Sequence, residues 1–266
     1  MVDSEPPEVT RLRREPPRFR RVEVRRVEPL SPRLVRITLT GPELDGLIIA
    51  EPAASVRLLV PGPGAELVMP EWKGNEFLLP DGRRAVIRTF TPRHFDPSVL
   101  ELDIDAVIHG DGPASTWAAA AGAGAVAAVS GPGRGYTIDP DASSFFLAGD
   151  ETAIPAISQL LEAIPPSILV QVHIEIGAPD ARLALPVHPR TSVAWHDLPA
   201  GAPPGAALVA AVRDADIARD GRVWVAGEAA AVQRIRRHLF DERAFVRAQT
   251  TVRGYWKHGR VGDADE

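Results

Sequence analysis

The chain has 266 residues, a formal net charge of −5, and 45% hydrophobic and 24% charged residues. This length accommodates two domains of ordinary size, and this composition is typical of soluble globular proteins. Cysteine is absent, which excludes disulfides, thiolate metal ligands, iron–sulfur clusters and cysteine nucleophiles. Any redox chemistry must therefore run on a bound organic cofactor.

Charge and hydropathy also limit the partners and the location. The net negative charge gives no reason to expect nucleic acid as a partner. There is no run of 18 apolar residues, and the first thirty residues are charged and Pro-rich, without the apolar core of a signal peptide. We therefore expect a cytoplasmic protein with no membrane insertion. We also expect a monomer, although the sequence does not settle the oligomeric state.

The N-terminal half has the pattern of an antiparallel β-barrel. Residues 1–18 are rich in Pro and Arg and are expected to form a flexible tail. A hairpin follows, with strands at Phe19–Glu28 and Leu34–Thr40. Further short strands are expected at Ser55–Val60, Glu66–Met69, Arg84–Thr91, Leu100–His109 and Val126–Ser130. Their regular spacing between Pro/Gly turns predicts an antiparallel barrel over residues 19–138.

One of these strands ends with the run Arg88-Thr89-Phe90-Thr91, directly before Pro92. Side chains alternate between the faces of a strand, so Arg88 and Phe90 point one way and the two threonines the other. A guanidinium can bind a phosphate, an aromatic ring can lie on a flat cofactor, and hydroxyls can hydrogen-bond its heteroatoms. In an ordinary sheet such residues are more often structural, so the run alone is weak evidence for a cofactor.

A Gly-rich loop, Gly110-Asp111-Gly112, leads into a short Ala-rich helix. Pro113, or Ser115 as a cap, suits the first turn of this helix. Backbone N–H groups and the positive end of the helix dipole favour a phosphate at such a turn. Many turns of this kind bind nothing, so this signal is also weak by itself.

The C-terminal half has the pattern of a parallel α/β sheet, and we place the domain boundary between residues 138 and 139. Strands are expected at Phe145–Ala148, Ile168–Ile176, Ser192–Trp195, Arg222–Ala226 and Val246–Arg253. Helices are expected at Ala153–Ala163, at Ala206–Val212, and from Gly227-Glu228 to about Phe240. Strands alternating with helices predict a sheet covered on both faces. Its ligands are expected at the C-terminal strand ends, where Gly149–Thr152 and Gly227-Glu228 lie.

Taken together, these motifs resemble the siderophore-interacting proteins, which are FAD-dependent ferric-siderophore reductases of the ferredoxin-reductase superfamily. Six such motifs occur in order over nearly the whole chain, and it is their combination that carries the resemblance. They are Arg88–Thr91, Asp103–Asp105 leading to His109-Gly110, Gly112–Ser115 with Trp117, Gly149–Ile157, Trp224–Glu228 and Gly254–Arg260.

The resemblance implies a cofactor pair: FAD in the barrel and NADPH or NADH in the α/β domain. It places Arg88 on the FAD pyrophosphate, Phe90 against the isoalloxazine ring and Thr91 near the reactive edge of that ring. The family usually has Tyr where this chain has Phe90, so stacking is retained while one hydroxyl contact is lost. The other cofactor-binding residues that it implies are Thr89, His109, Gly110, Ala114, Ser115, Trp117 and Thr152.

The resemblance also implies three catalytic candidates, Thr91, Thr152 and Glu228. Thr152 resembles the residue beside the nicotinamide and flavin rings, and Glu228 resembles an acidic group near the same junction. None of the three needs to act as a general acid or base, because hydride and electron transfer depend on position and redox tuning.

The C-terminal segment is expected to contribute a substrate pocket. Tyr255 and Trp256 are costly to leave in water, so the segment is expected to fold back onto the protein rather than fray. That would bring Lys257 and Arg260 to the cleft between the domains. Arg57 matches a family position that is commonly basic, although a solvated strand arginine is an equally good interpretation. Three cations at this place would suit an anionic ferric siderophore.

The function implied is reduction of a ferric siderophore by NAD(P)H through FAD, releasing Fe²⁺ in the cytoplasm. The seven histidines include no i, i+4 pair, so no metal site is expected and iron arrives inside its chelator. Two alternatives remain open, a flavoprotein electron carrier fed by ferredoxin and a siderophore-binding protein with little turnover. The nicotinamide donor is also open, because Glu175 would favour NADH whereas Arg182 could receive the 2′-phosphate of NADPH.

Overall fold

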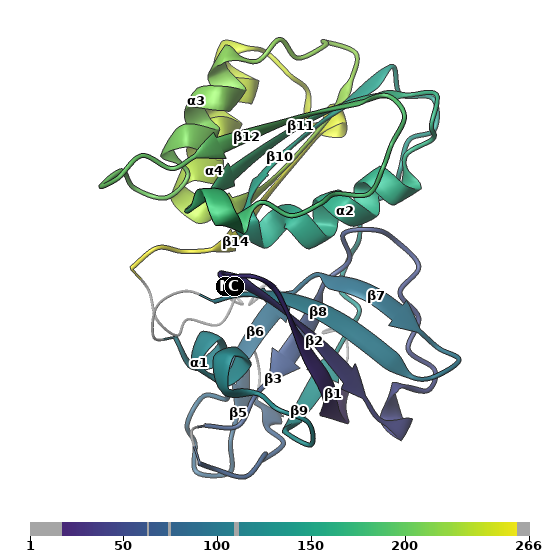
Figure 1. Ribbon diagram of the computed structural model, residues 1–266, viewed down its shortest axis with the longest axis vertical. Coiled ribbons are helices and arrows are strands. Elements are labelled where there is room, and N and C mark those ends of the chain that lie inside the picture. Colours follow the sequence, from purple (N-terminus) through teal and green to yellow (C-terminus); the bar gives the residue numbers. More distant parts are fainter. Residues whose placement is uncertain (1–17, 63, 74–75, 109–111, 260–266) are drawn as a thin grey trace, which may run out of the picture.

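The computed structural model describes residues 18–259 except for 63, 74–75 and 109–111, and it shows two domains joined along the long axis of the molecule (Figure 1). The expected N-terminal tail therefore lies almost wholly outside the described residues. The same is true of three predicted site residues, His109, Gly110 and Arg260.

The N-terminal domain is a curled antiparallel sheet of seven strands in the order β6-β3-β9-β1-β2-β8-β7. Its strands are β1 (Phe19–Ser31), β2 (Leu34–Thr40), β3 (Val56–Leu59), β6 (Ile87–Phe90), β7 (Pro92–Asp96), β8 (Glu101–Val107) and β9 (Val126–Ser130). The two edge strands, β6 and β7, are joined by the single residue Thr91, so the sheet must curl back on itself. This confirms the expected antiparallel barrel.

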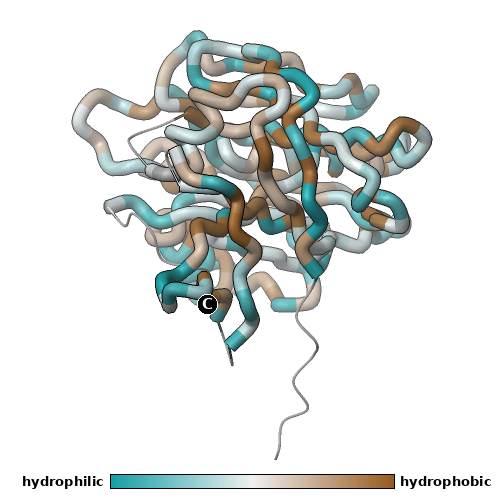
Figure 2. Tube along the Cα trace, turned by 90° about the horizontal axis from the view of Figure 1, so that it is seen from below, coloured by the Kyte–Doolittle hydropathy of each residue, from teal (hydrophilic) through white to brown (hydrophobic). Residues whose placement is uncertain are grey.

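Alternating side chains of these strands fill the barrel. Val22, Val24, Ile37 and Leu39 are at most 2% exposed and pack together with residues of β3, β8 and β9. The short helix α1 (Pro113–Ala120) also packs on this core, and it begins after Gly112 with proline in its first turn, as expected. Figure 2, seen from below, shows hydrophobic segments running through the middle of the molecule.

The C-terminal domain is a parallel sheet of five strands in the order β12-β11-β10-β13-β14. Its strands are β10 (Ser144–Asp150), β11 (Leu169–Ile176), β12 (Thr191–Asp197), β13 (Arg222–Glu228) and β14 (Thr250–Trp256). Helix α2 (Ile154–Ala163) covers the face toward the barrel, whereas α3 (Ala206–Asp214) and α4 (Ala229–Arg237) cover the other face (Figure 1). The expected two-sided α/β sheet is therefore confirmed.

Short helical turns complete the chain, namely η1 (Pro42–Leu44), η2 (Glu151–Ala153), η3 (Pro179–Ala181), η4 (His238–Glu242) and η5 (Arg247–Gln249). One of them explains an incorrect boundary. A strand was expected to begin at Val246, but η5 occupies the next three residues, so β14 begins at Thr250 and continues to Trp256.

Two expectations in the barrel were wrong. Glu66–Met69 has no strand structure, and the neighbouring β4 (Glu71–Lys73) and β5 (Glu76–Leu78) form a separate hairpin instead. The aromatic rings of Trp72 and Phe77, 4.7 Å apart, hold this hairpin together. Pro92 does not end the extended chain but opens β7, because an edge strand tolerates the missing N–H of proline at its first residue.

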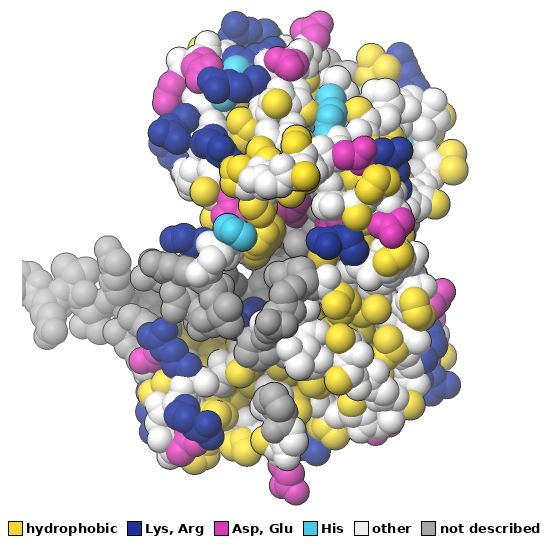
Figure 3. Space-filling view, turned by 60° about the vertical axis from the view of Figure 1, so that its left-hand side comes forward, with side chains coloured by type: hydrophobic (Ala, Val, Ile, Leu, Met, Phe, Trp, Pro, Cys, Tyr) yellow, Lys and Arg dark blue, Asp and Glu magenta, His cyan; other side chains and the backbone are white. Residues whose placement is uncertain are grey.

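Polar contacts hold the two domains together. Arg33, in the β1–β2 turn, forms an ion pair with the buried Glu151 at 3.0 Å. Gln159 of α2 accepts a hydrogen bond from the Ala53 N–H at 2.8 Å and donates one to the Pro92 carbonyl at 2.8 Å. Figure 3 shows charged side chains gathered at the boundary between the two lobes. These contacts set the relative position of the barrel and the sheet, and so the shape of the space between them.

Candidate functional site

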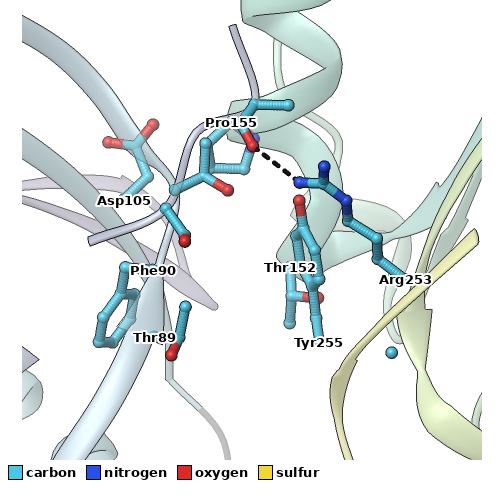
Figure 4. Close-up of a pocket in the computed structure, with 11 residues that line it drawn as sticks. Thr89, Phe90, Asp105, Thr152, Pro155, Arg253 and Tyr255 are labelled. Carbon is cyan, nitrogen blue, oxygen red and sulfur yellow. Dashed lines mark hydrogen bonds between the residues drawn. The ribbon is translucent and has the colours of Figure 1, made fainter. Parts of the chain in front are cut away.

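A pocket of about 340 Å³ lies between the domains, where the end of β6 meets the start of α2 and the end of β14. The barrel lines it with Ala53, Ser55, Thr89, Phe90, Thr91 and Asp105. The α/β domain lines it with Thr152, Pro155, Arg253, Gly254 and Tyr255. In Figure 4, Phe90 and Thr89 stand on the barrel side, facing Tyr255 and Thr152 across the space. Four predicted residues, Thr89, Phe90, Thr91 and Thr152, therefore meet at one place.

The register of β6 decides how the barrel side chains reach this pocket. Arg88 and Phe90 are paired with buried residues of β3, whereas Thr89 is paired with Arg57. Because directly paired residues share a face of the sheet, Arg88 and Phe90 point inward, and Thr89 and Arg57 point outward. This confirms the expected alternation. Phe90 packs against the barrel core and also lines the pocket, so its position is fixed by packing.

Arg88 is half-buried and directly precedes Thr89, the first residue of the run that lines the pocket. Its Nη1 donates a hydrogen bond to the carbonyl of Ile87 at 2.7 Å, so the guanidinium is held against its own strand. Its predicted role on the FAD pyrophosphate stays a prediction.

Thr91 connects the barrel to the last strand of the other domain. It is 7% exposed, and its hydroxyl is hydrogen-bonded to the phenol of Tyr255. Burial raises the pKa of Tyr255, so the phenol stays protonated and keeps this contact at neutral pH. Because both residues line the pocket, the contact joins the two domains at its wall. Tyr255 was predicted to dock, but its place in the pocket was not predicted.

Asp150, at the end of β10, is a buried carboxylate that gathers four hydrogen bonds. Its Oδ1 accepts from the Thr152 N–H at 3.0 Å and from the Thr152 hydroxyl at 2.5 Å. Its Oδ2 accepts from the Glu228 N–H and from the Trp256 indole N–H, both at 2.8 Å. Burial raises the pKa of Asp150, and these hydrogen bonds act in the opposite direction. The carboxylate therefore binds the Thr152 loop, the start of α4 and the C-terminal segment to one another.

Glu228 was predicted as a catalytic candidate near the junction of the flavin and nicotinamide rings. In the structure its Oε2 accepts from the Ala231 N–H at 2.8 Å, which caps α4, and its Oε1 accepts from the His258 N–H at 3.2 Å. Both carboxylate oxygens therefore accept hydrogen bonds from backbone N–H groups, and the residue is 4% exposed. The catalytic role of Glu228 stays a prediction, whereas its structural role is visible.

The C-terminal segment folds back as expected. The indole N–H of Trp256 binds Asp150, and Tyr255 lines the pocket, so both aromatic residues are docked. Lys257 follows directly and is exposed. Arg253, which was not predicted, also lines the pocket, and its guanidinium donates to the carbonyl of Ala53 at 3.3 Å (Figure 4, dashed line). The sequence signal for this position of Arg253 was its place at the end of the expected last strand, shortly before Tyr255 and Trp256.

The first turns of α1 contain the residues predicted to hold the remainder of FAD. Ala114 and Ser115 lie partly buried there, and Trp117 packs against the barrel core. Trp117 therefore has a packing role in the structure, and its contact with FAD stays a prediction.

The pocket suits a flat heteroaromatic ring. It combines two aromatic side chains, Phe90 and Tyr255, with hydroxyl groups from Ser55, Thr89 and Thr152. Aromatic faces can stack on such a ring, while hydroxyls can meet its nitrogen and oxygen atoms. Its volume falls in the ~300–1,000 Å³ range of small-molecule sites. The residues present therefore fit the isoalloxazine ring of FAD.

Among residues 18–259, outside the gaps, no three His, Asp or Glu side chains come together in a way that could hold a metal ion. Within the same residues, no helix is both long and apolar enough to cross a membrane.

Comparison with known proteins identifies relatives over nearly the full length. A siderophore utilization protein from T. fusca is 33% identical and superposes with a TM-score of 0.82, over 94% of this chain and 97% of that one. The ferric vibriobactin reductase ViuB of Vibrio cholerae is 28% identical over 239 residues, which is 88% of each chain. A ferredoxin NADP⁺ reductase from Neisseria gonorrhoeae, at 15% identity, shares the fold with a TM-score of 0.63.

The family assignment agrees with the two domains. Residues 23–136 match the siderophore-interacting FAD-binding domain, and residues 142–259 match the siderophore-interacting protein family. The first match covers the barrel, and the second covers the sheet with its C-terminal segment. The chain belongs to the siderophore-interacting protein family, and its barrel is the FAD-binding domain of that family.

Proposed function

We propose that this protein is a ferric-siderophore reductase that uses bound FAD to pass electrons from NADPH to Fe³⁺ held in an anionic siderophore. The observation that carries the proposal is the pocket between Phe90 and Tyr255, where the FAD-binding barrel meets the C-terminal edge of a parallel sheet. The relationship to a ferric reductase, ViuB, supports the same reaction class. The protein acts as a monomer in the cytoplasm, where reduction releases the iron.

The chemistry of the substrate explains why reducing the iron also releases it from the siderophore. Siderophores hold Fe³⁺ through hard oxygen donors, and the same donors bind Fe²⁺ far more weakly. FAD, when bound, accepts a hydride and donates single electrons, which links a nicotinamide donor to Fe³⁺. The protein therefore needs no metal ligands of its own, only a way to hold the chelate near the pocket.

The residues of the chain position the reactants. Phe90 is held by the barrel core, so it offers a fixed ring face to the isoalloxazine. Thr91 and Tyr255, which are hydrogen-bonded to each other, join the two domains at the wall of the pocket. Thr152 lines the same side of the pocket as Tyr255 and is held by Asp150. Together these side chains orient a bound ring between the two domains.

Cations near the pocket are proposed to attract the chelate. Lys257 is exposed immediately after the docked Trp256, and Arg57 lies on the same outer face as Thr89, which lines the pocket. Arg260 is proposed to join them, although it lies outside the described residues. Clustered positive charge raises the local concentration of an anionic ligand.

We propose NADPH rather than NADH as the donor. Glu175, which would select NADH by binding a ribose hydroxyl, is buried and accepts two backbone hydrogen bonds instead. Arg182 lies at the same edge of the sheet in an exposed ion pair with Asp197 at 3.1 Å. Exposed pairs of this kind contribute little stability, so the guanidinium can turn to a 2′-phosphate.

The test uses the purified protein. We expect it to be yellow, to bleach anaerobically when NADPH is added, and to recover its colour when a ferric siderophore follows, with Fe²⁺ appearing in a ferrous-specific chelator. Bleaching by reduced ferredoxin but not by NADPH or NADH would replace the nicotinamide donor by ferredoxin. Binding of the siderophore without recovery of colour would replace the reductase by a carrier.

A further inference from the structure

We propose that Asp150 is a positioning residue that holds the Thr152 hydroxyl as a hydrogen-bond acceptor toward the pocket between the domains. The pocket then favours a ligand atom that carries a hydrogen there over one that does not. The identity of that ligand, FAD, rests on the proposed function, whereas the hydrogen-bond arrangement rests on the structure alone.

Four donor groups surround the carboxylate of Asp150. Three of its partners are N–H groups, those of Thr152, Glu228 and the Trp256 indole, and an N–H group can only donate. Together these N–H groups donate to both carboxylate oxygens, and an ionised carboxylate has about four acceptor positions. An ionised carboxylate can only accept, so the fourth contact, from the Thr152 hydroxyl to Oδ1 at 2.5 Å, uses the hydroxyl proton.

A hydroxyl has one proton and two lone pairs. Once the Thr152 proton points to Asp150, only lone pairs remain for the pocket, which Thr152 also lines. Thr152 can thus accept a hydrogen bond from a ligand and cannot donate one. The hydrogen-bonding character of this side of the pocket is decided by Asp150, a residue enclosed behind it.

The residues around Asp150 pack closely against its carboxylate. Asp150 is 7% exposed, and a Cβ atom at Gly227 would lie 2.6 Å from its Oδ2. Gly227 also has a φ angle of +150°, so glycine alone suits this position on two grounds. Trp256 approaches the same oxygen from β14. Three chain segments are therefore shaped around one carboxylate.

The consequence for FAD follows from its chemistry. The oxidised isoalloxazine ring has bare nitrogen atoms where the two-electron-reduced ring carries N–H. A side chain that can only accept stabilises the reduced ring relative to the oxidised ring. Through Thr152, Asp150 should therefore raise the reduction potential of bound FAD.

The substitution Asp150→Asn tests this proposal, because the proposal and the simple loss of a negative charge predict opposite changes in the reduction potential of bound FAD. The amide nitrogen of Asn can donate to the Thr152 oxygen, which frees the hydroxyl proton to face the pocket. We expect the preference of the site for reduced over oxidised FAD to fall about tenfold, which lowers the potential by about 30 mV for a two-electron couple. Loss of a negative charge by itself has the opposite effect and raises the potential, so an unchanged or raised potential would overturn the proposal.

Variants of Thr152 provide the controls. Thr152→Val, which removes the acceptor, should lower the potential by a similar amount, and Thr152→Ser should keep the wild-type value. In the Thr152→Val background, Asp150→Asn should produce no further decrease, because the two residues act as one unit. A further decrease would show that Asp150 acts without Thr152. If Asp150→Asn does not fold, the reduction potentials of Thr152→Val and Thr152→Ser are compared instead. Equal potentials in these two variants would overturn the proposal.

A second readout needs no FAD. In the apoprotein the indole N–H proton of Trp256, identified by its loss in Trp256→Phe, should remain hydrogen-bonded and protected from exchange with solvent. It should stay protected in Asp150→Asn, whose remaining oxygen still accepts, and should exchange rapidly in Asp150→Ala. Equal protection in all three proteins would show that Asp150 does not organise this site.

The potential is measured by dye-coupled titration of bound FAD, without NADPH or chelate. Protein that binds no FAD would refute the proposed function itself. Protein that binds FAD and reduces a ferric chelate, yet shows no change of potential in the variants, would refute only the inference about Asp150.

Discussion

Glu175, the last acid of β11, accepts a hydrogen bond from the backbone N–H of Gly205 at 2.6 Å. Its second oxygen accepts from the N–H of Leu208 at 2.9 Å, so the carboxylate caps the first turn of α3. A Cβ atom at position 205 would lie 2.1 Å from the Cβ of Ala231, so the turn requires glycine. Glu175 thus joins β11 to α3, and both of its carboxylate oxygens are used by backbone N–H groups rather than offered to a ligand.

The first prediction concerns the nicotinamide donor. Arg182→Ala should lower kcat/KM for NADPH at least tenfold and leave that for NADH nearly unchanged, because one charge-assisted contact worth about 1.5–3 kcal/mol is lost. Glu175→Gln should leave the ratio of the two values unchanged. The matched control is Arg190→Ala, which removes an exposed arginine that directly precedes β12 and donates to the Ser167 carbonyl. Equal losses with both donors would contradict the role of Arg182.

The second prediction concerns Arg88. Arg88→Ala should weaken FAD binding at least tenfold, since a charge-assisted contact to phosphate contributes roughly 1.5–3 kcal/mol. Arg84→Ala, which removes an exposed arginine paired with Glu76, is the control and should bind FAD as the wild type does. Flavin retention after dilution measures both. Full occupancy in Arg88→Ala would show that the pyrophosphate lies elsewhere.

The third prediction concerns the aromatic ring at position 90. Phe90→Tyr should be tolerated, because the ring keeps its place between the barrel core and the pocket. Phe90→Ala should release FAD and also destabilise the barrel, by less than the ~3–5 kcal/mol of a fully buried Phe→Ala change. Flavin titration and urea unfolding measure the two effects. Similar FAD affinities in the two variants would mean that the ring does not stack on the isoalloxazine.

The fourth prediction separates the substrate pocket from the flavin. Lys257→Ala combined with Arg260→Ala should leave FAD reduction by NADPH unchanged and should slow reoxidation by an anionic ferric siderophore roughly tenfold. The defect should shrink at high salt, because the Debye length falls to ~3 Å at 1 M. Lys73→Ala, at an exposed lysine of β4, is the control. Equal slowing with neutral and anionic chelates would refute the basic pocket.

The fifth prediction concerns pH. His173 and His196, on neighbouring strands, lie with Nδ1 and Nε2 3.0 Å apart, and burial lowers the pKa of both. The folded protein therefore favours neutral rings, and its stability should be full above the unfolded pKa of about 6.5 and fall below it. The decrease should approach about 1.4 kcal/mol per pH unit for His173 and be smaller for His196, which is partly exposed.

Urea unfolding between pH 7.5 and 5.5 measures this decrease. His196→Gln should make it shallower, whereas His94→Gln, at an exposed histidine of β7, should leave it as in the wild type. The same slope in all three proteins would show that the pair does not respond to acid.

The amino-acid sequence by itself determined the local elements and most of the reactive surface. The strands Leu34–Thr40 and Val126–Ser130 have the bounds expected from alternation, because period-two patterning is a property of neighbouring residues. Thr89, Phe90 and Thr91, which the sequence marks as one run, all line the pocket, because consecutive residues at the end of a strand stay close together in space. The Gly149–Thr152 loop lies at a C-terminal strand end for the same kind of reason.

Only the tertiary structure decided what the buried acids do. Asp150, Glu175 and Glu228 all stand at strand ends in the sequence, where each is a plausible ligand group. Their hydrogen-bond partners come from other segments, and Trp256 lies 106 residues beyond Asp150. A buried carboxylate takes the donors that folding brings to it, because leaving it unpaired costs several kcal/mol. Since those donors are set by packing between distant segments, no local pattern could distinguish the capping acids from the one that shapes the pocket.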